Sequence, residues 1–113
     1  MEAKEASRQL DSMRVLDVRE YYEWAAGHIE GALHLPLRQL PHRFEEVERD
    51  RPILVTCQVG QRSALATEFL RERGYDAHNL EGGVAAWVAE GLTLVDPSNE
   101  EGMIVDGWAQ TLE

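Results

Sequence analysis

The chain has 113 residues, of which 43% are hydrophobic, and its 21 acidic and 11 basic side chains give a net charge of −10. This length is suited to one domain that buries about two-thirds of the surface its unfolded chain exposes. The acidic balance argues against a nucleic-acid partner, because phosphates require a basic surface. With no run of about 18 apolar residues and no amino-terminal signal pattern, we expect a cytoplasmic protein that makes no membrane contact.

The single cysteine, Cys57, excludes an internal disulfide and a zinc site built from cysteines. The four histidines, at positions 28, 34, 42 and 78, lack the paired spacing of metal ligands. We therefore expect neither a metal nor another cofactor.

The predicted elements alternate between strands and helices, which indicates an α/β fold with a central, mainly parallel β-sheet and helices on both faces. The pattern predicts helices over 3–10, 20–26, 63–73 and 84–90, one or two short helices within 37–47, and extended segments at 15–18, 34–36, 53–55 and 77–80. Gly27 and Gly74 each follow a predicted helix, where a glycine in the left-handed conformation commonly ends it.

The most informative stretch lies between the apolar strand at 53–55 and the helix that begins at Ser63. Cys57 ends this strand, and the carboxyl ends of strands are where open α/β sheets place their sites. A tight loop at a helix start directs backbone N–H groups inward and favours an anion, here the Cys57 thiolate. Gly60 gives the loop conformational freedom and Arg62 adds a positive charge. We predict a thiol pKa below about 7.5.

A lowered pKa by itself gives only a small gain in reactivity. At pH 7, lowering a thiol pKa from about 8.5 by about two units raises the thiolate fraction from roughly 3% to roughly 75%. The intrinsic nucleophilicity falls roughly 8-fold over the same change, which leaves a net gain of about 3-fold. The loop must therefore also stabilise a charged adduct on the sulfur or charge on a departing group.

Four spaced motifs carry a resemblance to a known family. Cys57-x-x-Gly60-x-Arg62-Ser63 resembles the active-site loop of the single-domain rhodanese family of sulfurtransferases. The other three motifs are Leu-Asp-Val-Arg-Glu at 16–20, Gly-His-Ile-Glu-Gly-Ala at 27–32 with Leu-Pro at 35–36, and Leu-Glu-Gly-Gly-Val-Ala-Ala-Trp at 80–87. The resemblance extends from residue 15 to about residue 91, and four motifs in one order make it specific.

This resemblance implies a rhodanese-like fold and a persulfide intermediate on Cys57, the catalytic residue. It implies a donor such as thiosulfate, or a protein persulfide, and cyanide or a thiol as the acceptor. We expect the chain to be a monomer or a homodimer. The loop that would hold the sulfur comprises Gln58, Val59, Gly60, Gln61, Arg62 and Ser63.

Asp17 either orients Arg62 or ties down a loop, and we favour the structural role. We also expect a structural ion pair between Arg19 and Glu30.

Two other functions stay open. Phosphatases and arsenate reductases of related folds carry a Cys-x5-Arg loop, whereas only four residues separate Cys57 from Arg62, which predicts a narrower loop suited to one sulfur atom. A non-catalytic or regulatory rhodanese-like module that carries sulfur without turnover is the second alternative.

We assign 1–95 to the sulfurtransferase domain and 96–113 to an acidic carboxyl-terminal extension. The extension has five acidic residues and no lysine or arginine, yet it contains Met103, Ile104, Val105, Trp108 and Leu112. This mixture predicts an arm that docks on its own domain or on a partner, near arginines such as Arg38 and Arg43, with partial disorder as the alternative.

Overall fold

The computed structural model describes residues 1–105, and residues 106–113, with Trp108 and Leu112, lie outside the described residues. The strands are β1 (Arg14–Asp17), β2 (Leu33–His34), β3 (Ile53–Thr56) and β4 (Ala77–Asn79). The α-helices are α1 (Ala3–Gln9), α2 (Tyr21–Ala26), α3 (Leu40–Arg43), α4 (Gln61–Glu72) and α5 (Gly83–Ala89), with 3-10 turns at Leu10–Ser12, Leu37–Gln39 and Phe44–Glu46. Of the helices in residues 1–105, none has the length and apolar character needed to cross a membrane.

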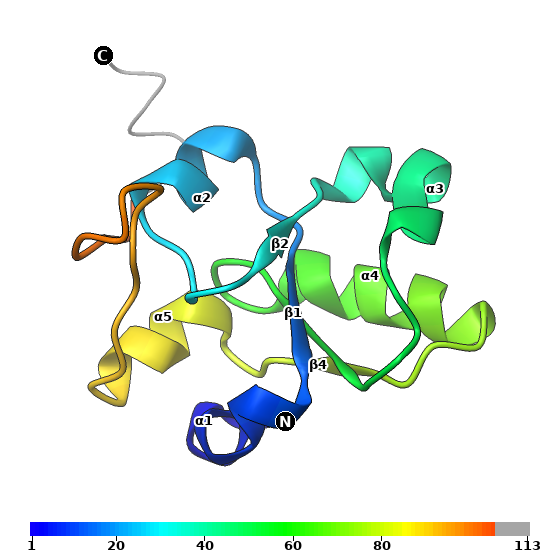
Figure 1. The fold of residues 1–113 in the computed structure, drawn as a ribbon, viewed down its shortest axis with the longest axis horizontal. Helices are drawn as coiled ribbons and strands as arrows, with labels where there is room; N and C mark the ends of the chain where they lie inside the picture. The colour runs from blue at the N-terminus through cyan, green and yellow to red at the C-terminus, as the bar shows by residue number, and fades with distance from the viewer. Residues whose placement is uncertain (106–113) are drawn as a thin grey trace.

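Within these residues the strands form one four-stranded parallel sheet in the order β2-β1-β3-β4 (Figure 1). In this register Asp17 lies opposite Thr56, and Val55 lies opposite Asn79. The carboxyl ends of β1, β3 and β4 therefore meet at one edge of the sheet, beside Cys57. This architecture confirms the predicted α/β fold.

Two hydrophobic clusters cover the two faces of the sheet. Alternate residues of β3 enter different clusters, because successive side chains of a strand point to opposite faces. Val55 packs with Ala66 and Leu70 of α4, whereas Leu54 packs in the cluster that contains Val84 of α5 and the α1 alanines. All four β3 residues are buried, as the short apolar run predicted.

The described part of the extension lies on its own domain, beside α2 (Figure 1). The Met103 N–H donates to the Ala26 carbonyl at 2.8 Å, and the Gly102 N–H donates to the Leu94 carbonyl at 2.9 Å. Immediately before the extension, His28 and Val95 exchange two backbone hydrogen bonds of 2.9 and 2.8 Å. Among residues 96–105 no acidic side chain pairs with the expected arginines: Arg38 pairs with Glu20, and Arg43 pairs with Glu46.

The prediction that Gly27 ends α2 in the left-handed conformation is wrong. Gly27 follows α2, but its φ of 176° is extended and not left-handed. A Cβ atom at this position would lie 2.6 Å from the backbone N and O of Met103. Glycine is therefore needed here for the close approach of the extension and not to end the helix.

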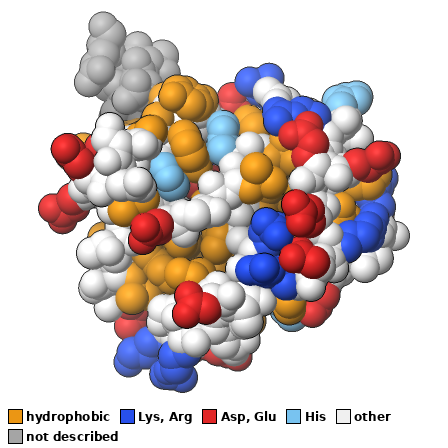
Figure 2. All heavy atoms as spheres, viewed as in Figure 1, with side chains coloured by type: hydrophobic (Ala, Val, Ile, Leu, Met, Phe, Trp, Pro, Cys, Tyr) orange, Lys and Arg blue, Asp and Glu red, His pale blue; other side chains and the backbone are white. Residues whose placement is uncertain are grey.

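Trp24, in α2, stacks with the rings of two histidines. The Trp24 indole lies between the imidazoles of His28 and His34, with ring centroids 4.0 and 5.3 Å away. Figure 2 shows histidine and hydrophobic side chains together on this face of the molecule. A ring nitrogen of His28 is hydrogen-bonded to the Trp24 carbonyl, and a ring nitrogen of His34 is hydrogen-bonded to the Arg19 carbonyl. Both histidines therefore have structural contacts.

Candidate active site

The Cys57 sulfur lies at the amino terminus of α4, surrounded by hydrogen-bond donors. Gly60 precedes the helix with a φ of +102°, a left-handed conformation that turns the loop sharply toward α4. The Sγ atom accepts the Gly60 N–H at 3.1 Å, the Ser63 N–H at 3.4 Å and the Ser63 hydroxyl at 3.3 Å. This arrangement can hold a negatively charged sulfur.

Burial and hydrogen bonding act in opposite directions on this thiol. Burial raises the pKa of Cys57, whose residue is only 1% exposed. Hydrogen bonds from the Ser63 hydroxyl and from the backbone N–H groups of Ser63, Gly60 and Val59 lower the pKa by more, so that the net pKa is below the ordinary value. The direction agrees with the predicted acidic thiol, and its main cause is hydrogen bonding.

The first turn of α5 contacts the backbone of the loop that begins at Cys57. The N–H of Val84 donates to the Cys57 carbonyl at 2.9 Å, and that of Ala85 donates to the Gln58 carbonyl at 3.0 Å. Gly83, with a φ of +59°, comes so close that a Cβ atom there would lie 2.4 Å from the Cys57 carbonyl oxygen. The two adjacent glycines at 82–83 were the sequence signal for this close contact.

Arg62 does not extend freely toward the sulfur. Its guanidinium forms two 2.8 Å hydrogen bonds with the carboxylate of Glu23 in α2, whose side chain is 3% exposed. Hydrogen bonding to Glu23 raises the pKa of Arg62. Burial raises the pKa of Glu23, but the hydrogen bonds from Arg62 and from the Glu20 backbone, together with the charges of Arg62 and Arg19, lower it by more, so its net pKa falls below the ordinary value.

Sequence reasoning missed Glu23. The signal for it was its position three residues after Glu20, since the two form a reciprocal capping box at the start of α2.

Asp17 pairs with Arg19 and not with Arg62. The Asp17 carboxylate accepts the Arg19 Nη2 at 2.7 Å and its Nε at 3.0 Å, and both side chains are fully buried. Arg19 also donates to the Gly27 carbonyl at 2.7 Å. The expected pair between Arg19 and Glu30 is therefore wrong, and Glu30 is exposed.

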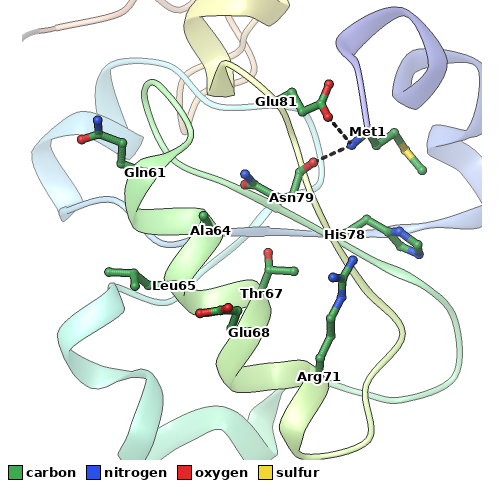
Figure 3. Close-up of a pocket in the computed structure, with 10 residues that line it drawn as sticks. All are labelled: Met1, Gln61, Ala64, Leu65, Thr67, Glu68, Arg71, His78, Asn79 and Glu81. Atoms are coloured by element: carbon green, nitrogen blue, oxygen red, sulfur yellow. Dashed lines mark hydrogen bonds and ion pairs between the residues drawn. The ribbon is translucent and has the colours of Figure 1, made fainter.

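The remaining loop residues lie in different surroundings. Val59 is 57% exposed at the tip of the loop. Gln61 lines a pocket of about 460 Å³ between α4 and β4 (Figure 3). Gln58 contributes its backbone carbonyl to the contact with α5. Their assignment to a sulfur-binding loop stays a prediction.

Asn79, at the end of β4, is a second residue that sequence reasoning missed. Its Oδ1 atom lies 2.5 Å from the Ser63 hydroxyl oxygen, and its Nδ2 donates to the Gly60 carbonyl at 3.2 Å. It thus contacts two of the residues that surround the sulfur. Among residues 1–105 no group of three His, Cys, Asp or Glu side chains could hold a metal ion.

The Glu23–Arg62 ion pair should make the effect of Arg62→Ala on the free energy of unfolding depend on pH. Arg62→Ala leaves a buried carboxylate unpaired and should lower the free energy of unfolding by about 2 kcal/mol, less than for a fully buried pair because the Arg62 side chain is 37% exposed. The pKa of Glu23 is lowered by folding, so the pair contributes stability above about pH 4.5 and loses it as pH falls through the lowered pKa. The difference in the free energy of unfolding between the wild type and Arg62→Ala should therefore become smaller at acidic pH.

Urea unfolding between pH 7 and pH 3 measures this difference. The double variant Glu23→Gln, Arg62→Gln is the control, because it removes both charges and should recover most of the lost stability. A double variant no more stable than Arg62→Ala would contradict the ion-pair explanation.

The chain matches the model of the family described as Rhodanese-like domain over residues 2–90. It is 38% identical to a protein of Allochromatium vinosum named Sulfurtransferase, over 77% of this chain and 82% of that one. It is 36% identical to Thiosulfate sulfurtransferase GlpE of Shewanella oneidensis, over 67% of this chain and 76% of the relative.

A solved structure shares both the fold and much of the sequence. The rhodanese-related protein of Thermoplasma volcanium superimposes with a TM-score of 0.82 at 35% identity, covering 84% of this chain and 95% of the other. The match therefore spans nearly the whole of that chain. On the family match, the relatives and the fold, the chain belongs to the family of rhodanese-like domains.

Proposed function

We propose that this chain is a sulfurtransferase, in which Cys57 receives a sulfane sulfur from a donor and transfers it to a thiophilic acceptor. The observation that carries the proposal is the Cys57 sulfur itself, which accepts hydrogen bonds from the Gly60 N–H and from the N–H and hydroxyl of Ser63 at the start of α4. The names of the relatives, a sulfurtransferase and a thiosulfate sulfurtransferase, support the same reaction class.

With thiosulfate as the donor, the first half of the reaction forms a persulfide. The Cys57 thiolate attacks the outer sulfur of thiosulfate, and a new S–S bond forms. The S–S bond of thiosulfate breaks, and its electron pair leaves with sulfite. The enzyme then holds one additional sulfur, with the negative charge on the outer atom of the persulfide.

The second half returns the enzyme to its starting state. The carbon of cyanide, or the sulfur of a thiolate, attacks the outer sulfur of the persulfide. The S–S bond to Cys57 breaks and its electron pair regenerates the thiolate, so thiocyanate or a new persulfide leaves. Because the thiolate is released here, donors on Gly60 and Ser63 stabilise the leaving group in this step.

The position of Arg62 disfavours the phosphatase alternative. Hydrolysis of a phosphate ester by a cysteine enzyme needs a positive charge free to bind the oxyanion. In this structure both terminal nitrogens of Arg62 are bound to the Glu23 carboxylate. The loop is also one residue shorter than Cys-x5-Arg.

Intact-mass measurement tests the proposal. After incubation with thiosulfate the protein should gain the mass of one sulfur atom, and cyanide should remove it with release of thiocyanate. A chain that gains no sulfur from thiosulfate or from a low-molecular-weight persulfide would overturn the proposal. Sulfur that loads but resists cyanide and thiols would support the carrier alternative, and faster hydrolysis of aryl phosphate than consumption of thiosulfate would support a phosphatase.

A further inference from the structure

The Ser63 hydroxyl has two acceptors and one hydrogen. Its oxygen lies 3.3 Å from the Cys57 sulfur and 2.5 Å from Oδ1 of Asn79. Ser63 is fully buried, so water does not supply a further partner from bulk solvent. A single O–H group cannot donate fully in both directions.

The orientation of the Asn79 amide is determined by Gly60. The Gly60 carbonyl accepts the amide nitrogen at 3.2 Å, and the opposite orientation would place two oxygen atoms against each other. Figure 3 shows the Asn79 side chain extending from β4 toward the first turn of α4. The amide oxygen is therefore the atom presented to Ser63, as a pure acceptor.

We propose that Asn79 is a positioning residue, which controls how the hydroxyl hydrogen of Ser63 is divided between the Asn79 amide oxygen and the Cys57 sulfur. When Cys57 is a thiol, its S–H group can donate to the Ser63 oxygen while Ser63 donates to Asn79, and every group is satisfied. When Cys57 is a thiolate, the Ser63 hydrogen is drawn to the charged sulfur, and Asn79 loses that donor. Asn79 thus favours the thiol relative to the thiolate.

This role restrains the acidity that the loop gives to Cys57. Intrinsic thiolate nucleophilicity falls as the thiol pKa falls, and the best attacking thiol has a pKa near the ambient pH. By competing for Ser63, Asn79 keeps the sulfur more nucleophilic than the loop donors alone would leave it. The inference rests on Cys57 being the reactive group of the proposed function.

The pH profile of alkylation by iodoacetamide tests this inference, because it reports the thiol pKa whether or not the chain transfers sulfur. Asn79→Leu removes the competing acceptor and should lower the midpoint of the profile by about 0.5 to 1 pH unit, the equivalent of one ordinary hydrogen bond. Asn79→Ala repeats the test with a smaller side chain. His78→Gln, on the same strand, is the matched control and should leave the midpoint unchanged.

Ser63→Ala provides the decisive comparison. If Asn79 acts through Ser63, the shift caused by Asn79→Leu or Asn79→Ala should vanish when Ser63→Ala is also present. A residue that merely stiffens the loop would instead raise the midpoint when removed, since the Gly60 and Ser63 N–H donors would be displaced. A raised midpoint, or an equal shift with and without the Ser63 hydroxyl, would overturn the inference.

Discussion

Replacing Cys57 by serine should reduce sulfur transfer to the background rate without protein. The chain has no second cysteine that could take over, and a hydroxyl has far too high a pKa to be ionised at neutral pH by hydrogen bonds of this kind. The substitution changes one atom, so the packing of this buried residue should be preserved. Thiocyanate release from thiosulfate and cyanide measures the loss.

Leu65→Ala is the control for this variant. Leu65 lies in α4 close to the loop, but its side chain is 61% exposed and lies outside the sulfur-binding residues. It should retain the wild-type transfer rate. Measurable turnover or addition of sulfur in Cys57→Ser, with an unchanged melting temperature, would contradict the proposed persulfide.

Gly83→Ala should cause the second largest loss, although Gly83 contributes no side chain to the site. The added Cβ would meet the Cys57 carbonyl oxygen at 2.4 Å and the Gln58 carbonyl carbon at 2.5 Å, both backbone atoms that cannot rotate away. The loop must therefore move, and a displacement of about 1 Å can reduce catalysis by about 100-fold. We expect a loss of that order in the rate of transfer.

Gly91→Ala separates this clash from backbone strain. Gly91 also has a left-handed φ, +82°, and follows the same helix, but a Cβ atom there has nothing within 4 Å. It should share the strain cost of about 1 kcal/mol and keep full transfer activity. Equal activity of the two variants would show that the contact with α5 does not position the loop.

The sequence was sufficient for features that depend on neighbouring residues. The apolar run of β3 and the helical spacing of α4 are local patterns, so the strand, the helix and the place of Cys57 between them could be predicted. The structure confirms the predicted place of Gly74 after α4, where its φ of +87° is left-handed. The order of such elements determined the α/β class.

Only the tertiary structure decided which side chains meet. Arg62 and Glu23 are 39 positions apart, and Ser63 and Asn79 are 16 apart, so their pairing depends on how α2 and β4 pack beside α4. Many carboxylates could match a given arginine by charge, as the alternative of Asp17 beside Arg62 and the expected pair of Glu30 with Arg19 illustrate. Gly27 shows the same limit for glycine, because a local pattern cannot reveal that the backbone of Met103, 76 residues further along, lies against it. Charge and residue type are properties of the sequence, whereas distance and desolvation, which select one partner among several, arise from packing.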